Sequence, residues 1–348
     1  KTFCGHFLDL ESDWNSRETC LDSLERCLKK GSNDEQYYAL QCLSALTVQF
    51  DPRIVTDWIE KFLPFLQVLA KDTNVHPKVR GAALMTISVF LFFSLDLDLK
   101  RLKDILDLME SVFRGSYLKG DRTVANVTAE QANMHVVALQ SWSLLFSQIP
   151  LEMASDYTTN VRKHLPDLLE SNHVEVRIAG GETLALLFER IRSDNSAFKG
   201  MNFPQLREKL EELANDGAKN RAKTDRKKQR QSFRDVLATI STRENIYEKV
   251  RFGKEELELE DWVSKRYYDS LCSVLGSGVN VHLQENFLVR DIFDLGAPLP
   301  KLEPTDAKKG EEKNQRRLAN QANEKNRSLM RKPNRSKRAD VAALNDDF

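Results

Sequence analysis

Apolar residues in the first two thirds of the chain recur at helical spacing and in a repeated order. After Val79-Arg80, a small residue follows at Ala83, and large apolar residues follow at Ile87 and Phe90. The same offsets from Val176-Arg177 lead to a glycine and two leucines, at positions 180, 184 and 187. Weaker copies begin at Glu35 and Met134, so that successive copies start 44, 55 and 42 residues apart. The chain therefore contains an internal helical repeat.

The repeat length and its order of residues resemble armadillo or HEAT repeats. The small residue would let neighbouring helices approach closely, and the apolar stripe would pack on the next repeat. Residues 111–130 form the extra length between the second and third copies and are expected to be a loop or insertion. Pro52, Pro64, Pro150 and Pro166 lie between or at the starts of apolar runs, where helices are expected to begin or end. The fold class expected is all-α, an armadillo/HEAT-like helical superhelix.

Shorter elements follow Pro204. Residues 249–262 alternate apolar and polar positions on both sides of Gly253, which predicts one small β-hairpin. The glycines at Gly276 and Gly296 are expected to end helices. The helices predicted in this part of the chain are Gln205 to Asn215, Ser232 to Ile240, Val263 to Leu275 and Leu283 to Leu295.

Three regions are expected. Residues 1–216 would form the armadillo-like repeat domain, and residues 217–299 a C-terminal helical subdomain with the hairpin. Residues 300–348 hold few aliphatic residues and no aromatic residue before Phe348. This basic tail is expected to be disordered until bound, because it buries too little apolar surface to offset the entropy of ordering.

The formal net charge of zero conceals a strong separation of charge. Residues 219–230 hold seven Lys/Arg against one Asp, a net +6, and residues 308–338 hold twelve against three Glu, a net +9. The remainder of the chain therefore carries −15. Two basic segments on an acidic body indicate contact with an anionic polymer at chosen places, although a solvated linker or a nuclear import signal would show the same composition.

Nucleic acid is the expected anionic partner. The basic segments lack aromatic residues for base stacking, so recognition of the phosphate backbone is favoured over base reading. The candidate RNA-binding residues are Lys219, Arg221, Lys223, Arg226, Lys227, Lys228, Arg230, Arg316, Arg317, Lys325, Arg327, Arg331, Lys332, Arg335, Lys337 and Arg338.

Catalytic and metal-binding chemistry is not indicated. The six histidines show no HxxxH or HExxH pattern, and the five cysteines form no CxxC pair, so neither a metal nor a cofactor is expected. No paired carboxylates or nucleophile elbow appear, and an enzyme with a small-molecule substrate is not expected. His76 and His173 occupy matching repeat positions and are expected at helix starts.

Other residues are expected to be structural. Arg80 and Arg177 should each tie a repeat to an acidic neighbour. Trp262, Tyr267 and Tyr268 are more typical of a core cluster than of a base-stacking platform. The apolar run from Ala82 is about 14 residues long, whereas a membrane span needs roughly 20. The chain begins at Lys1 without a leader, so we expect its native N-terminus upstream.

Three stretches resemble the interferon-related developmental regulator family. They are Asp225 to Ile240 (DRKKQRQSFRDVLATI), Trp262 to Gly296 and Ser336 to Val341 (SKRADV). The VRGAALMTISVF block resembles the armadillo-like part of that family. The final residues 342–348 are acidic, and Pro333 interrupts the basic run, which departs from the family pattern.

The resemblance implies a non-enzymatic factor with one of two functions. One is the binding of idle ribosomes, through ribosomal RNA and proteins, with a basic segment in the mRNA channel and helical parts over the tRNA sites, which represses translation. The alternative is a nuclear transcriptional co-regulator that recruits corepressor complexes with histone deacetylase activity. A cytoplasmic location follows from the first and a nuclear one from the second.

Overall fold

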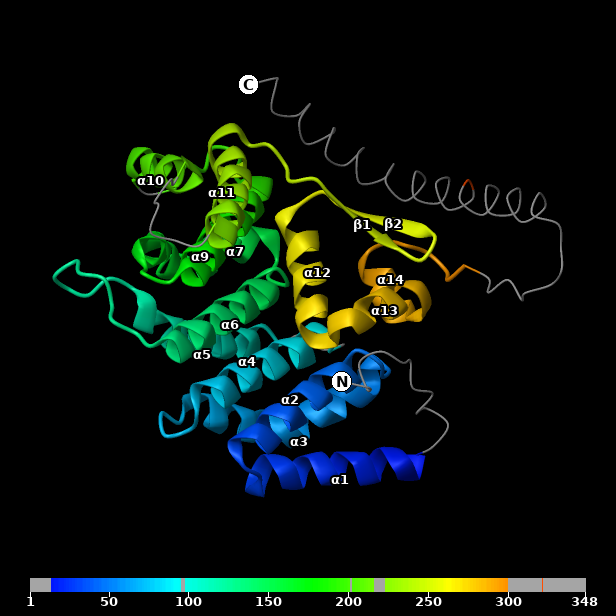
Figure 1. Ribbon diagram of the computed structural model, residues 1–348. Coiled ribbons are helices and arrows are strands. Elements are labelled where there is room, and N and C mark those ends of the chain that lie inside the picture. The colour runs from blue at the N-terminus through cyan, green and yellow to red at the C-terminus, as the bar shows by residue number, and fades with distance from the viewer. Residues whose placement is uncertain (1–13, 95–97, 201, 216–222, 300–320, 322–348) are drawn as a thin grey trace. The chain divides into compact units, whose positions relative to one another are not determined.

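The computed structural model of this chain describes residues 14–94, 98–200, 202–215, 223–299 and 321. These residues divide into two compact units. The first comprises Asp9–Glu248 and Leu259–Val274, and the described part of the second comprises residues 249–258 and 275–299. The described elements are helical apart from a single two-stranded hairpin (Figure 1). The expectation of a helical fold with one small hairpin is confirmed, whereas the three predicted region boundaries stay a prediction.

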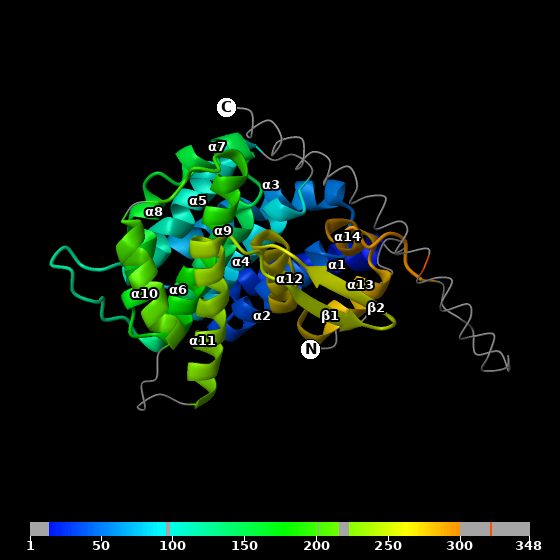
Figure 2. The ribbon, with the colours of Figure 1, turned by 90° about the horizontal axis from the view of Figure 1, so that it is seen from above.

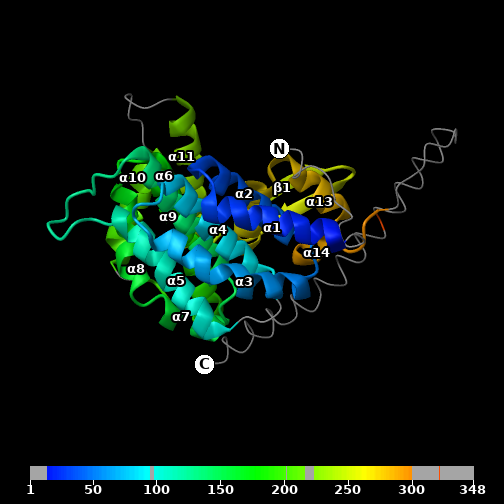
Figure 3. The same cartoon turned by 90° about the horizontal axis from the view of Figure 1, so that it is seen from below.

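The first unit contains two rows of helices. Helices α2, α4, α6, α9 and α11 pack successively on one another and are called the inner row, and the helix preceding each packs against it as an outer row. Figure 3 shows α1, α3 and α5 of the outer row. The bounds are α1 Trp14–Lys30, α2 Asn33–Thr47, α3 Pro52–Lys71, α4 Pro77–Phe92, α5 Leu99–Phe113, α6 Ala129–Phe146, α7 Leu151–Tyr157, α8 Val161–His164, α9 Val174–Asp194, α10 Phe203–Asn215, α11 Lys223–Leu237 and α12 Trp262–Leu275.

Helix starts follow local capping chemistry. Ser32 with Glu35, and Thr128 with Gln131, form capping boxes in which each side chain bonds the other residue's backbone N–H. The His76 side chain caps α4 by accepting from Lys78 N, which confirms that histidine as a helix start. His173 is likewise the N-cap residue of α9. These caps place the first turns of the inner-row helices.

Proline positions agree with the expectation at helix starts but not throughout. Pro52 is in the first turn of α3, Pro150 precedes α7 and Pro166 begins a 3₁₀ helix at Leu165–Glu170. Pro64, however, lies inside α3, so the expectation that it marks a helix end is wrong. Phe62 and Leu63 before Pro64 and Leu66 after it are buried, and this packing maintains the helix despite the missing N–H.

The internal repeat has a direct structural counterpart in two buried hydrogen bonds. Ser44 Oγ lies 2.9 Å from Thr86 Oγ1 between α2 and α4, and Ser143 Oγ lies 2.9 Å from Thr183 Oγ1 between α6 and α9. Both threonines follow their Val-Arg pair at the same offset, and both serines hold matching positions in the weaker copies. Repeat units of the sequence therefore pack in one register.

Two glycines of the inner row lie close to neighbouring elements. A Cβ on Gly81 would lie 3.6 Å from Met134 Cα, so α4 and α6 meet backbone to backbone. A Cβ on Gly180 would lie 2.9 Å from Leu168 Cβ. A side chain at Gly180 would force Leu168 to shift, whereas one at Gly81 would make an ordinary contact with α6.

The expected insertion corresponds to an irregular segment. Helix α5 continues to Phe113 and a 3₁₀ turn follows at Arg114–Ser116 (η1), after which irregular chain leads to the cap at Thr128. No helix in the part of the chain that the structure describes is both long and apolar enough to cross a membrane.

The second unit is built around a buried arginine. Strands β1 (Glu248–Phe252) and β2 (Glu255–Leu259) form the hairpin, with Gly253 at φ 53° in the turn. Arg290 donates to both carboxylate oxygens of Glu255, at 2.9 and 3.0 Å, and to the carbonyls of Leu283 and Leu295. This arginine thereby ties the hairpin to the helices that follow.

A single helix from Leu283 to Leu295 was expected, and this expectation is wrong. The chain forms α13 (Val279–Glu285) and α14 (Phe287–Ile292), separated by Asn286 in an extended conformation. The Asn286 side chain accepts from the backbone N–H groups of Leu288 and Val289. Asparagine competes with the helix for these donors and starts a new one. Gly276 at φ 55° ends α12 as predicted.

Candidate nucleic-acid interface

Helix α11 carries the first basic segment and packs against α9 and α10 (Figure 2). Its inward face consists of Gln229, Phe233 and Val236, each at most 1% exposed. The Phe233 ring fills the space left by Gly181 on α9, where a Cβ would lie 2.7 Å from a ring carbon. The apolar spacing predicted a helix from Ser232, and the helix in fact begins earlier, at Lys223.

A buried arginine fastens the basic half of α11 to the body. Arg177 donates from Nε and Nη2 to Gln229 Oε1, at 3.2 and 2.6 Å, and from Nη1 to the carbonyl of Ser171 at 2.6 Å. These bonds satisfy Gln229 within an apolar surrounding, where an unsatisfied amide would cost about 1–3 kcal/mol. The basic turn of the helix is therefore held at a defined place.

The hydrogen bonds described for the repeated arginines go to uncharged acceptors, and the expectation that each meets an acidic neighbour stays a prediction. Arg177 donates to an amide and a carbonyl, and Arg80 donates from Nε to the carbonyl of Ala70 at 3.0 Å. Burial lowers the pKa of Arg80, and the more distant Asp72 acts in the opposite direction. A buried backbone carbonyl at a helix end needs a hydrogen-bond donor, as a carboxylate does. The sequence alone does not show which of these acceptors an arginine will meet.

The other end of α11 is secured by a second arginine of α9. The chain continues from Leu237 into a short π-helix, η3 (Ala238–Thr242). Arg192 donates to the carbonyls of Thr239 and Ile240, at 3.0 and 2.8 Å, and Trp262 Nε1 donates to Thr239 Oγ1 at 2.8 Å. The middle of the basic helix, at Gln229, and the chain that follows its C-terminal end are thus hydrogen-bonded to the folded body.

A buried polar cluster lies under the middle of α11. Glu182 of α9 accepts from Ser232 Oγ at 3.3 Å and from Arg266 Nη2 of α12 at 3.3 Å. Burial raises the pKa of Glu182, and the Arg266 guanidinium opposes that rise. The cluster joins three helices and contributes to the placement of α11 relative to α9.

The outward side of α11 presents a row of cations, which we name the basic stripe: Lys227, Arg230 and Arg234. The three residues follow each other at i, i+3 and i+7, so they share one helix face. Lys227 and Arg234 are exposed and Arg230 is half-buried. A row of this kind suits contact with successive phosphates of a nucleic-acid backbone.

Arg234 was not among the residues predicted to bind RNA. It lies after the basic segment, in the apolar SFRDVL passage, and its place became evident only with the helix phase. Its spacing from Lys227 and Arg230 was the signal that would have found it.

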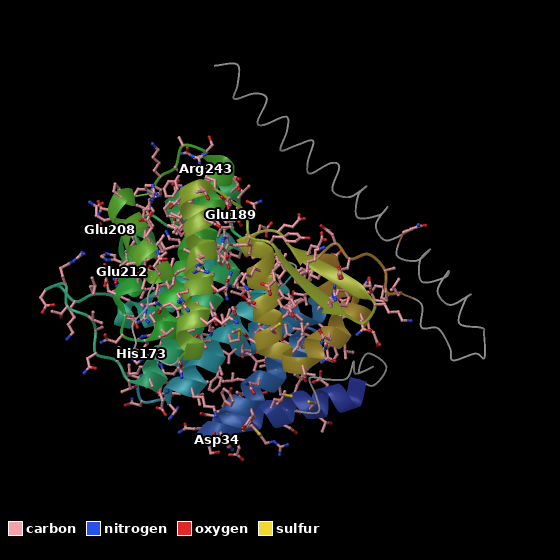
Figure 4. All side chains as sticks on the ribbon, turned by 45° about the horizontal axis from the view of Figure 1, so that its top comes forward. Asp34, His173, Glu189, Glu208, Glu212 and Arg243 are labelled. Carbon is pink, nitrogen blue, oxygen red and sulfur yellow. The ribbon has the colours of Figure 1, made fainter. Side chains whose placement is uncertain are left out.

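Acidic side chains limit the basic stripe on both sides. Lys228, on a neighbouring face of α11, forms an ion pair of 2.8 Å with Glu175 of α9. On the other flank, α10 carries the exposed Glu208 and Glu212 (Figure 4). These carboxylates disfavour an anion that would spread beyond α11, so a bound phosphate chain is expected to follow the helix axis.

The predicted RNA-binding residues fall into three groups. Lys227, Lys228 and Arg230 are described, and they lie on α11 as stated above. The backbones of Lys223 and Arg226 belong to the same helix. The remaining predicted residues lie outside the described part of the chain: Lys219, Arg221, Arg316, Arg317, Lys325, Arg327, Arg331, Lys332, Arg335, Lys337 and Arg338.

The aromatic residues near the hairpin have structural contacts, as the core interpretation expected. Trp262 is 3% exposed. Tyr267 Oη accepts from Gln148 Nε2 at 2.9 Å, and its ring lies 4.9 Å from that of Phe92. Burial raises the pKa of Tyr268 above its ordinary range. Neither Trp262 nor Tyr267 offers a free ring face to a base.

Among the described residues, no three His, Cys, Asp or Glu side chains converge in a way that would hold a metal ion. The arrangement on α11 places positive charges on one face of an anchored helix.

Two family models match the chain. The one described as interferon-related developmental regulator (IFRD) matches residues 2–241, and the one described as interferon-related protein conserved region matches residues 286–339. The first match includes all of α11, and the second extends into the second basic segment.

Several named proteins are similar to the chain over most of its length. Interferon-related developmental regulator 1 of Sus scrofa is 38% identical over 327 residues, and the protein of the same name from Homo sapiens is 37% identical over 326 residues. Each alignment covers 93% of this chain and 72% of the relative. Interferon-related developmental regulator 2 of Mus musculus is 36% identical over 325 residues, which cover 93% of this chain and 73% of that protein.

Proposed function

This chain belongs to the interferon-related developmental regulator family, and on that premise we propose that it is a non-enzymatic, cytoplasmic factor that binds ribosomes and represses translation. The basic stripe on α11 would contact ribosomal RNA at a fixed position on the body. The basic residues of segment 308–338 would enter the mRNA channel, and helical parts would lie over the tRNA sites.

The single observation that supports this proposal most is the anchoring of α11. Gln229 and Phe233 fasten the helix inward, while Lys227 and Arg234 remain exposed on the other side. A merely solvated charged linker would not need a buried amide bonded to a buried arginine. Fixed cations lose little conformational entropy when they meet a phosphate backbone, which favours binding.

The two rows of helices fit the proposal as a scaffold of the armadillo type. Matching Ser–Thr hydrogen bonds in successive units indicate a repeated packing geometry. In repeat proteins of this class, stacked helix pairs present extended surfaces to large partners. We propose that such a superhelix docks on ribosomal protein and RNA, while the chain outside the two basic segments, which carries −15, avoids non-specific RNA contact.

Repression would follow from occlusion. A basic segment inside the mRNA path and an mRNA cannot occupy the same volume, so no chemical step is required. The proposal therefore assigns no catalytic group and no cofactor to the chain.

Removal of the second basic segment tests the mechanism. The full chain and a variant that ends at Leu299 would be compared in a reconstituted translation assay, with thermal unfolding as the control for fold. The shortened chain should unfold at a similar temperature and lose inhibition. Equal inhibition by both chains would refute the channel mechanism.

Sedimentation tests ribosome binding itself. A cell lysate would be spun through sucrose at low and at high salt. Co-migration with ribosomal particles that falls steeply with rising salt is expected, because binding to phosphates releases counterions. Exclusive recovery in nuclear complexes free of ribosomes would contradict the proposal and favour the co-regulator alternative.

A further inference from the structure

A groove of about 440 Å³ crosses the inner-row helices α2, α4 and α6, beside the C-terminal end of α12. These three inner-row helices pack directly on one another (Figure 1). Gln41, Lys78, Glu130, Asn133 and Ser273 line the groove and are exposed, so it is open to solvent along its length. None of these residues belongs to the basic stripe.

The floor of the groove is apolar. Gly81 and Ala82 of α4 leave a hollow between the larger side chains of Met85, Met134 and Val137. Methionine side chains adapt to differently shaped apolar partners, because they are unbranched and polarizable. The floor can therefore receive aliphatic side chains from another molecule.

One end of the groove already holds a cation. The Lys78 ammonium lies 4.0 Å from the ring centroid of Tyr37 and 5.6 Å from that of Tyr38, and 3.5 Å from Asp34 Oδ1. Tyr38 is 63% exposed. Two tyrosine rings beside a carboxylate form a favourable site for an ammonium or guanidinium group. Figure 4 labels Asp34 at the start of α2.

The carboxylates of the rim outnumber its cations. Asp34 and Glu130 have side chains that are 78% and 66% exposed, and Lys78 is the ammonium group among the lining residues. His76 Nε2 lies 3.5 Å from Glu130 Oε2. The excess of negative charge favours a basic occupant and disfavours a phosphate chain.

Amide side chains stand along the groove in positions that suit a peptide backbone. Gln41 of α2, and Asn133 and Gln140 of α6, line it. Asparagine and glutamine amides can donate and accept at once, and so can match the paired N–H and C=O of an extended chain. Within the described residues, Asn133 and Gln140 enter no hydrogen bond through their side chains.

The chain's own α12 shows that the adjoining surface accepts a polypeptide. Phe92 of α4 and Leu144 of α6 pack with Tyr267, Leu271 and Val274 of α12. The groove continues from Val274, which lines both this contact and the groove itself. Beyond that point, the inner row presents the same kind of apolar surface without α12 on it.

We propose that this groove binds a short extended segment of a partner protein, in which aliphatic residues alternate with Lys or Arg. Its aliphatic side chains enter the floor, its cations meet the exposed carboxylates of Asp34 and Glu130, and its backbone meets the amides. A small-molecule site usually encloses most of its ligand, whereas this groove is open along an exposed rim. The interaction is separate from ribosome binding and uses other residues.

Three fluorescein-labelled synthetic peptides of equal length test the proposal by anisotropy titration with the full chain. One alternates Leu with Lys, one alternates Leu with Glu, and one alternates Ser with Lys. The Leu–Lys peptide should bind saturably, and about tenfold tighter than either of the others. Absence of saturable binding by the Leu–Lys peptide up to about 1 mM, a weak affinity of about −4 kcal/mol, would overturn the proposal.

A charge reversal on the rim provides the decisive variant. Asp34→Lys with Glu130→Lys should weaken the Leu–Lys peptide by about five- to tenfold and strengthen the Leu–Glu peptide, because each rim pair is worth roughly 0.2–1 kcal/mol. The matched control reverses Asp104 and Asp107, two exposed carboxylates of α5, and should change neither affinity. Thermal unfolding of both double variants checks that the fold persists.

The remaining outcomes also decide the proposal. Equal loss in the α5 control would show a general charge effect and refute a specific groove. Tighter binding of a peptide of residues 322–338 than of the Leu–Lys peptide would assign the groove to this chain itself and overturn the partner. Single-stranded RNA that is displaced by the Leu–Lys peptide would likewise overturn it.

Discussion

Removal of the basic stripe is expected to change the salt dependence of ribosome binding without changing the stability of the fold. The perturbation is Lys227→Ala with Arg230→Ala and Arg234→Ala. Each lost phosphate contact should make the slope of log affinity against log salt less negative by about 0.7–0.9. If all three residues contact phosphates, the slope should change by about 2. The ratio of the parent's affinity to that of the variant should then be roughly 15-fold smaller at 200 mM salt than at 50 mM.

The structure indicates that the fold should tolerate these substitutions. Lys227 and Arg234 are exposed, and no ion pair is recorded for them or for Arg230 within the described residues. The contacts that hold α11, through Gln229 and Phe233, are untouched. Exposed substitutions of this kind usually change the free energy of unfolding by no more than about 0.5 kcal/mol each, and alanine favours the helix.

The assay is co-sedimentation of the full chain with purified ribosomes over a series of salt concentrations. The matched control replaces three exposed lysines of the outer-row helices by alanine, namely Lys30, Lys71 and Lys100 on α1, α3 and α5. Its net charge changes by the same amount, and its slope should equal that of the parent. Identical slopes for the two triple variants would refute a specific role of α11 and leave only a general charge effect.

Three further predictions concern the support of α11 and the inner row. Arg177→Leu should lower the free energy of unfolding in urea by about 2–5 kcal/mol, since it leaves the buried Gln229 amide and a carbonyl without their donor; a loss below about 1 kcal/mol would contradict this. Gly181→Ala should cost about 1–2 kcal/mol in the same measurement, because overpacking against Phe233 exceeds the gain in helix propensity, and a stabilised variant would be the contrary result. Burial, with a smaller contribution from Arg80, lowers the pKa of His135 from 6.5 to about 4. Because the unfolded chain then binds the proton first, the free energy of unfolding should be highest above about pH 6.5 and should fall by up to roughly 3 kcal/mol as the pH drops to 4. His135→Gln should flatten this part of the pH profile, and an unchanged profile would exclude the histidine as its source.

Sequence patterns predicted helices and strands well where nearby residues alone determine the secondary structure. The alternation around Gly253 produced the hairpin, and glycine at Gly276 ended a helix. The repeat offsets also place Thr86 and Thr183 at the same position of two copies, and the structure shows that each bonds a serine of a neighbouring helix. These features depend on periodicity and on backbone freedom, which are properties of a short stretch of chain.

Errors arose where packing with other parts of the chain, or a local side-chain cap, outweighs the periodic pattern. Pro64 continues inside α3 because packing on its flanks outweighs the lost hydrogen bond. Arg177 bonds Gln229, which lies 52 residues along the chain, a partner that the repeat pattern did not indicate. Asn286 divides an expected helix because its side chain supplies a local cap, a choice that periodicity alone does not reveal.

The sequence by itself determined the helical class, the repeat register and the separation of charge, because composition and spacing contain these directly. Only the tertiary structure decided which cations of the first basic segment face outward, since that depends on the phase at which Gln229 and Phe233 lock α11 onto α9. It also decided that Arg234 joins the basic stripe, and that α2, α4 and α6 leave a groove of opposite charge preference. A charge pattern lies along the chain, but a binding surface forms from side chains that only packing brings together.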